Sequence, residues 1–148
     1  MEGEFFVLDT NDWVNVLALT PDQEIVLVRQ FRYGSKEQSL EPPGGVVERG
    51  EDPLVAGLRE LQEETGYVGE SPELLGVVRP NAAILSNRCH VMLVRNVEKK
   101  AALNFDQHEE LATELYPVAD LKNMIRNGEI THSIGLNSLL MLILKLDL

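Results

Sequence analysis

The stretch GVVERGEDPLVAGLRELQEETGY, residues 45–67, decides the fold of this chain. Asp52 followed by Pro53 predicts a helix start, because an Asp at the N-cap accepts a free backbone N–H and Pro fits the first helical position. Gly66 predicts the end of this helix, since glycine adopts the left-handed conformation at little cost. We therefore expect one short helix between Pro53 and Gly66.

This helix has one apolar face and one acidic face. Its apolar positions recur every three to four residues, at Leu54, Leu58 and Leu61, and we expect them to pack on other elements. The opposite face carries Gly57, Glu60 and Glu64, with Glu63 beside them, and is expected to be exposed. Carboxylates this close repel one another unless a cation lies among them, and hard oxygen ligands suit Mg²⁺ or Mn²⁺. The alternative is a solvated acidic helix face without a metal.

The same stretch follows the pattern G-x5-E-x7-R-E-U-x-E-E-x-G-U, in which U is an apolar residue. The residues at the named positions are Gly45, Glu51, Arg59, Glu60, Leu61, Glu63, Glu64, Gly66 and Tyr67. This pattern resembles the Nudix box, the signature of a family that hydrolyses a nucleoside diphosphate linked to another group. Tyr67 is the one departure, because the family usually has an aliphatic residue there. The resemblance implies an α/β fold, an α/β/α sandwich around a mixed β-sheet, with residues 1–148 as a single Nudix hydrolase domain.

The resemblance also implies roles for residues in and near the box. Glu60, Glu63 and Glu64 are expected to hold one to three divalent ions, and in the family a backbone carbonyl of the preceding glycine turn, here Gly44, joins them. We interpret two other charged residues, Arg59 and Glu51, as a salt-bridged pair that orients the metal ligands.

The general base is expected from one of two places. Hydrolases of this type use either a Glu of the box, such as Glu63, or a Glu of a later loop. The later segment DQHEELATELYPV offers Glu109 and Glu110. Glu109 is the first choice because similar ADP-ribose hydrolases place a loop Glu at this distance before a Tyr-Pro-like strand end. The alternative for both is a solvated acidic turn.

Two further segments, VRQFRYG and SLEPPGG, resemble parts of ADP-ribose and nucleotide-sugar pyrophosphatases. The candidate substrate-binding residues in them are Arg29, Phe31, Arg32, Tyr33 and Glu41. The two arginines could contact phosphates bidentately, and either aromatic ring could stack on a base. The alternative is a buried strand over residues 25–31 with arginines at its end.

Composition limits the partners. The chain has 24 acidic residues against 13 Lys and Arg, and its formal charge of −11 would repel polymeric nucleic acid. A small anionic substrate stays possible, because a bound cation supplies local positive charge. The apolar run LLMLILKL is shorter than the roughly 20 residues that span a bilayer, so we expect no membrane partner. A single cysteine, Cys89, allows no disulfide within one chain, which favours the cytoplasm.

Hydrophobic patterns and turn residues predict the remaining elements. Strands are expected at 13–19, 25–33, 74–78, 88–97 and 113–118, helices at 120–126 and 133–146, and a loop over residues 34–45. Strands on both sides of an internal helix, with helices late in the chain, indicate a layered α/β domain.

The resemblance implies a metal-dependent pyrophosphatase of nucleoside diphosphate sugars, such as ADP-ribose and GDP- or ADP-sugars. Its products would be a nucleoside monophosphate and a sugar phosphate. The alternatives are a house-cleaning hydrolase of nucleoside triphosphates or dinucleoside polyphosphates, and a non-catalytic Nudix module that senses a nucleotide sugar. Related pyrophosphatases are commonly homodimers, so we expect a homodimer here.

Overall fold

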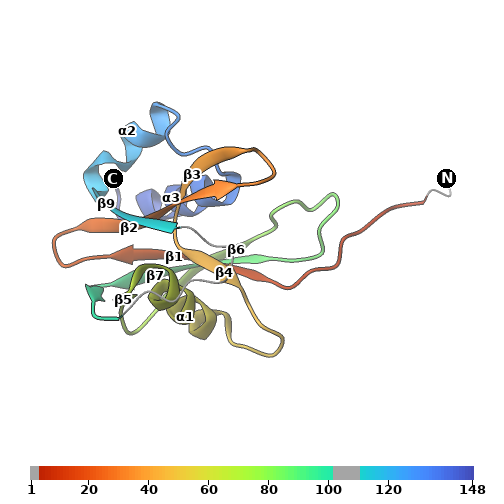
Figure 1. Cartoon of the computed structure of the whole chain (residues 1–148), viewed down its shortest axis with the longest axis horizontal. Coiled ribbons are helices and arrows are strands. Elements are labelled where there is room, and N and C mark those ends of the chain that lie inside the picture. The colour runs from red at the N-terminus through yellow and green to blue at the C-terminus, as the bar shows by residue number, and fades with distance from the viewer. Residues whose placement is uncertain (1–3, 102–110) are drawn as a thin grey trace.

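A mixed sheet forms the centre of the computed structural model, which describes residues 4–101 and 111–148. The strands are β1 (Trp13–Leu19), β2 (Glu24–Arg32), β3 (Glu37–Glu41), β4 (Gly44–Val46), β5 (Tyr67–Val68), β6 (Glu73–Val78), β7 (Cys89–Arg95), β8 (Glu98–Lys99) and β9 (Leu111–Pro117). The helices are α1 (Pro53–Thr65), a 3-10 turn (Val118–Asp120), α2 (Leu121–Arg126) and α3 (Ser133–Lys145). The main sheet runs β3-β2-β1-β7-β6, with β4 also paired to β1 and β9 to β2 (Figure 1).

The sheet is mixed because β1 and β7 pair in parallel, from Trp13 opposite Cys89 to Leu19 opposite Arg95. The other pairings of this sheet are antiparallel. β5 and β8 form a separate two-stranded pair beyond the end of α1.

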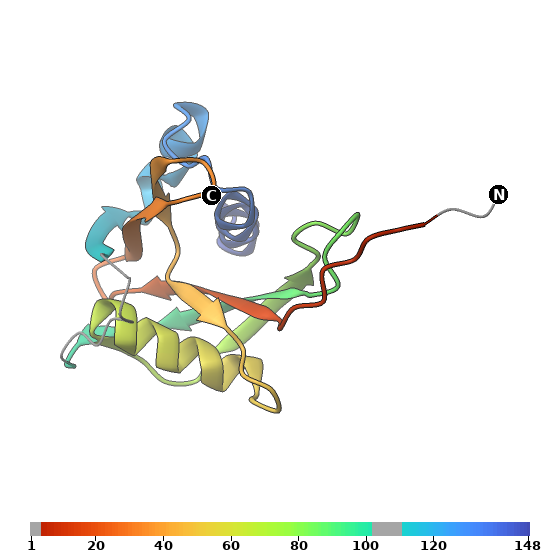
Figure 2. The ribbon, with the colours of Figure 1, turned by 45° about the vertical axis from the view of Figure 1, so that its right-hand side comes forward.

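Helices cover both faces of the sheet, as Figures 1 and 2 show. Successive side chains of a strand point to opposite faces, so β1 contributes to two cores. Val14 and Val16 pack with Leu61 of α1. Leu17 and Leu19 pack with α2 and α3 on the other face. The expected α/β/α sandwich is therefore confirmed.

Helix α1 begins and ends where the sequence predicts. The Asp52 carboxylate accepts a hydrogen bond from the Leu54 N–H at 2.8 Å. Gly66 follows the helix in the left-handed conformation, with φ of 72°, and its N–H donates to the Gln62 carbonyl.

The prediction that the Gly57–Glu64 side of α1 is exposed was wrong. Gly57 is buried, and a Cβ there would lie 2.2 Å from Met92 Sδ. Glu64 is only 4% exposed. The reason is that α1 lies across β1 and β4, so this side of the helix faces the sheet and the turn before it.

The prediction of a loop over residues 34–45 was also wrong, because this segment contains β3 and the start of β4. Gly44 explains why β4 was missed. A Cβ at this position would lie 2.0 Å from the Val14 carbonyl oxygen, so only glycine lets β4 approach β1 this closely. The other expected strands and helices are present, with ends that differ by at most two residues.

Cys89 is buried, and burial raises the pKa of its thiol to about 12, which fits a structural residue. None of the helices in the described part of the chain combines the length and apolarity that crossing a bilayer requires.

Candidate active site

A pocket of about 450 Å³ lies where α1, β1, β2, β4 and the start of α3 meet. Its lining residues are Trp13, Val14, Asn15, Gln30, Arg32, Gly44, Gly45, Val46, Glu60, Glu64, His132 and Ile134. It therefore brings two carboxylates of the box to the same cavity as the glycine turn and one arginine of β2.

The two box carboxylates lie against the backbone of Gly44 and Gly45 at the start of β4. Oε2 of Glu64 accepts a hydrogen bond from the Gly44 N–H at 2.9 Å. Gly45 leaves no space between backbone and carboxylate, since a Cβ there would lie 2.5–2.7 Å from the Glu60 carboxylate atoms. The absence of a side chain at Gly45 thus decides where the Glu60 oxygens can sit.

Arg59 joins two carboxylates outside the pocket, those of Glu51 and Glu63, to the Glu60 carboxylate inside it. Its Nε donates to Glu51 at 3.1 Å, and its Nη1 donates to Glu60 at 2.8 Å and to Glu63 at 3.1 Å. The hydrogen bond with Arg59 lowers the pKa of Glu51 and in turn raises the pKa of the guanidinium. Glu51 also accepts the Glu48 N–H at 2.9 Å. The geometry places Arg59 and Glu51 together, as expected, with the guanidinium bridging to two box carboxylates.

The donor set fits a hard divalent cation. Glu60 and Glu64 offer carboxylate oxygens beside a backbone turn, and Mg²⁺ in proteins typically takes one or two carboxylates and keeps several waters. Glu63 faces Arg59 and does not line the pocket. In residues 4–101 and 111–148, no three His, Cys, Asp or Glu side chains are gathered into a ready cluster. If Glu60 and Glu64 are the first two ligands, Glu63 could become the third only by a rearrangement of its side chain, because Arg59 holds both Glu60 and Glu63.

The two arginines of β2 do not act together. Arg32 lines the pocket and binds Glu41 through two hydrogen bonds, of 2.9 and 2.6 Å. Arg29 instead binds Glu114 of β9, at 2.5 and 3.0 Å, and does not line the pocket. Residues three apart in a strand point to opposite faces, which is why the pair divides. The hydrogen bond to Arg29 lowers the pKa of Glu114.

The two candidate stacking residues are exposed. The rings of Phe31 and Tyr33 meet edge to face, with centroids 5.3 Å apart, and neither lines the pocket. Glu109 and Glu110, the candidates for the base, lie outside the described residues.

Besides the box glycine Gly45, seven lining residues were not among the candidates from the sequence: Trp13, Val14, Asn15, Gln30, Val46, His132 and Ile134. Gln30 is two positions from Arg32 and so shares its face of β2, which the strand period could have indicated. His132 and Ile134 reach the pocket only because α3 docks on β1, through the Asn15 Nδ2 to Ser138 Oγ hydrogen bond of 3.0 Å among other contacts. No local pattern signals that docking.

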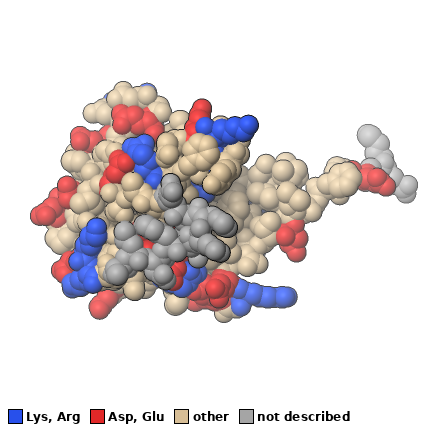
Figure 3. All heavy atoms as spheres, viewed as in Figure 1, with Lys and Arg blue, Asp and Glu red and all other residues tan. Residues whose placement is uncertain are grey.

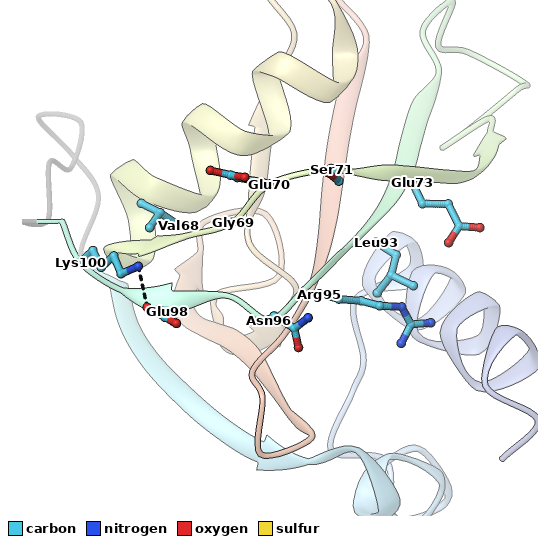
Figure 4. A pocket seen from close by; sticks show the side chains of 10 residues that line it. All are labelled: Val68, Gly69, Glu70, Ser71, Glu73, Leu93, Arg95, Asn96, Glu98 and Lys100. Carbon is cyan, nitrogen blue, oxygen red and sulfur yellow. Dashed lines mark ion pairs between the residues drawn. The ribbon is translucent and has the colours of Figure 1, made fainter.

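A second pocket, of about 540 Å³, lies near the ends of β7 and β8 and is drawn in Figure 4. It contains none of the box residues. Its charged residues are already paired in part, Lys100 with Glu98 at 2.6 Å and Glu73 with Lys145 at 2.5 Å. Figure 3 shows basic side chains scattered among acidic ones, so the described part of the face seen in Figures 1 and 3 has no continuous basic surface for nucleic acid. The pocket lined by Glu60 and Glu64 is therefore the candidate active site.

Comparison with known proteins gives the class of this chain. The family model of the NUDIX domain matches residues 10–134, so the chain belongs to the Nudix family. The chain also has the fold seen in a crystal structure of an ADP compounds hydrolase. The TM-score is 0.83, the match covers 92% of this chain and 72% of that one, and the two sequences are 19% identical.

Particular relatives are more similar in sequence. The chain is 37% identical to the methanol dehydrogenase activator of Bacillus methanolicus and 34% identical to the ADP-ribose pyrophosphatase of Bacillus subtilis (strain 168), in each case over 66% of this chain and 55% of the relative. It is 43% identical to the ADP-sugar pyrophosphatase of Mus musculus over 47% of this chain and 32% of that protein. The chain thus spans about half the length, or less, of these curated relatives.

Proposed function

We propose that this chain hydrolyses the pyrophosphate bond of nucleoside diphosphate sugars, such as ADP-ribose and ADP- or GDP-sugars. The products would be a nucleoside monophosphate and a sugar phosphate, and Mg²⁺ or Mn²⁺ would be required. The names of two relatives, ADP-ribose pyrophosphatase and ADP-sugar pyrophosphatase, support this substrate class. The observation that carries the proposal is the pocket in which Glu60 and Glu64 lie opposite the glycine turn together with Arg32.

The charges of the pocket explain why a cation is needed. A diphosphate is strongly anionic, and two carboxylates alone would repel it. Glu60 and Glu64 would hold the divalent cation, with the Gly44 carbonyl and Glu63 as further ligands. A cation held by these residues would offset the phosphate charge and would make the attacking water more acidic.

The chain's own residues supply orientation and proton transfer. Arg59 holds Glu60 and Glu63 through its Nη1, so it fixes the direction in which the ligand oxygens point. Arg32, already placed by Glu41, can donate hydrogen bonds to a phosphate oxygen of the substrate. Glu109 is proposed as the base that takes the proton of the attacking water, with Glu110 and Glu63 as the alternatives.

Two features outside the pocket support a homodimer located in the cytoplasm. Phe5 and Phe6 are 88% and 87% exposed on an N-terminal arm that leaves the body of the molecule in Figures 1 and 2, and a second copy could cover them. Cys89 is buried and free, which fits a reducing compartment. Light scattering of the purified chain tests the homodimer.

A substrate panel tests the proposed function. The purified chain is assayed in Mg²⁺ with ADP-ribose, ADP-glucose, GDP-mannose, ATP and diadenosine tetraphosphate, with chromatography of the products. We expect AMP or GMP together with a sugar phosphate, and no turnover in EDTA. Cleavage of only ATP or the dinucleotide would favour the house-cleaning alternative. Tight binding of a nucleotide sugar without turnover would favour the sensing alternative.

A further inference from the structure

A buried carboxylate at the end of β3 holds two side chains that line the pocket. The Glu41 side chain is only 3% exposed, and its Oε2 lies 2.6 Å from Arg32 Nη2 and 2.9 Å from His132 Nδ1. Burial would raise the pKa of Glu41, but the contacts with Arg32, His132 and Ser39 outweigh it and lower the pKa to about 2. Glu41 is therefore a fixed acceptor that faces both side chains.

The contact with Glu41 determines which nitrogen of His132 is available. An ionised carboxylate only accepts hydrogen bonds, so the proton of a neutral imidazole lies on Nδ1, which faces it. The 2.9 Å contact does not meet hydrogen-bond geometry, and the described part of the chain offers the buried Nδ1 no other hydrogen-bond partner. The carboxylate that Nδ1 faces therefore favours the proton on that nitrogen. Nε2 of the neutral ring then carries a lone pair. It needs a donor from the ligand, which a phosphate oxygen cannot supply.

The ring edge that carries Nε2 is the one left for a ligand. His132 lines the pocket with a side chain that is 29% exposed, and its Nδ1 is buried, so Nε2 is the ring nitrogen that remains for a ligand. The position of His132 depends on the close packing of the start of α3 against the residue after Glu41. A Cβ at Gly135 would lie 3.2 Å from Pro42 Cδ and 3.4 Å from His132 Nδ1, so glycine lets the first turn of α3 pack against the segment that follows Glu41.

We propose that His132 Nε2 accepts a hydrogen bond from a hydroxyl of a pentose that flanks the diphosphate of the substrate. Resting on the proposed function, this adds His132 as a specificity-determining residue. Arg32 and His132 share one carboxylate oxygen, so a group on His132 lies next to a phosphate on Arg32. In ADP-ribose the hydroxyl donors nearest the phosphates belong to two pentoses, the ribose of the nucleoside and the distal ribose, whereas in ADP-glucose or GDP-mannose the distal sugar is a hexose. The amino group of adenine lies a whole ribose further away.

Binding of analogues that cannot be cleaved tests this contact apart from catalysis. Dissociation constants in Mg²⁺ are measured by calorimetry for the α,β-methylene analogues of ADP-ribose, IDP-ribose, ADP and 2′,3′-dideoxy-ADP. We expect His132→Ala to weaken the ADP-ribose analogue roughly three- to tenfold, the usual worth of one neutral hydrogen bond, and to leave the dideoxy-ADP analogue unchanged. The ADP analogue shows which pentose is bound: no change means the distal ribose, and an equal loss means the ribose of the nucleoside.

Two variants separate this role from a structural one. His132→Asn keeps a donor near Glu41 but lacks the reach of Nε2, so we expect the same selective loss even if His132→Ala is unstable. His90→Ala removes another histidine–carboxylate pair, the 2.9 Å contact with Asp12 outside the pocket, and should leave every dissociation constant unchanged.

Other results would overturn the proposal. Equal weakening of all four analogues by His132→Asn would mean a phosphate contact or a general loss of structure. A loss that disappears with the IDP-ribose analogue would mean that His132 binds the amino group of adenine. Selective binding without any turnover in the substrate panel would instead refute only the proposed hydrolysis, so the two failures are distinguishable.

Discussion

Gly45→Ala is expected to damage the active site while leaving the fold intact. The added Cβ would lie 2.5 Å from Glu60 Cδ, whereas carbon atoms in contact are roughly 3.5–4.0 Å apart. The Glu60 carboxylate must therefore move by about 1 Å. A displacement of about 1 Å in a catalytic constellation can cost roughly a hundredfold in rate. We expect a loss of that size in kcat/KM for a nucleotide sugar, together with weaker Mg²⁺ activation.

The fold should tolerate this substitution because the atoms in conflict are the end of a flexible side chain. The melting temperature of Gly45→Ala should stay within a few degrees of wild type. Gly34→Ala is the matched control, because its Cβ would meet nothing within 4 Å, and it should retain full activity. A Gly45→Ala protein with unchanged kcat/KM and Mg²⁺ dependence would refute the inference that the Glu60 oxygens must sit against this turn.

Three further substitutions test other parts of the site. Glu64→Gln is isosteric but uncharged, and we expect it to lose at least about a hundredfold in turnover, since charge stabilisation through a bound metal is worth several kcal/mol. Its circular dichroism spectrum should show normal folding. Full activity of the wild type in EDTA would contradict this reasoning. Glu109→Gln should lower turnover roughly a hundred- to ten-thousandfold with little change in Mg²⁺ affinity, and Glu110→Gln should lower it much less. Normal turnover of Glu109→Gln together with an inactive Glu63→Gln would place the base in the box. For Glu41, a folded pKa of about 2 against the ordinary 4.5 means that its stabilisation is complete above pH 4.5 and is lost as the pH falls towards 2. In urea unfolding, wild type should lose on the order of 3 kcal/mol more over this range than Glu41→Gln, and parallel curves would contradict the assignment.

Helix α1 and its carboxylates could be predicted because their signals are local. Asp52, Pro53 and Gly66 act within one turn of the helix ends, and the box spacing fixes which carboxylates share a side. The exposure of that side could not be predicted, because burial of Glu64 depends on β4 reaching β1. The sequence Gly44–Gly45 is typical of a turn. Its pairing with β1 depends on the lack of Cβ atoms at these positions and not on a preference of glycine for strands.

The substrate side of the site was predictable only in part. Arg32 and Glu41 are nine positions apart and pair across neighbouring strands, so a motif can carry both. Arg29 was assigned the same role from the same motif, but the strand period sends it to Glu114 on the other face. His132 has no signal at all in its own neighbourhood, because its partner Glu41 comes from β3.

The docking of α3 on β1 has a consequence for how the pocket is acquired during folding. Asn15 and Ser138 are separated by 123 residues, yet their hydrogen bond helps to place His132 beside Glu41. Closing so long a loop is entropically costly and slow relative to forming α1 or the β1–β2 hairpin. During synthesis the box carboxylates leave the ribosome well before α3, so the part of the site proposed to hold the metal can assemble before the part proposed to bind the substrate. A nascent chain would then gain affinity for divalent cations before it gains affinity for a nucleotide.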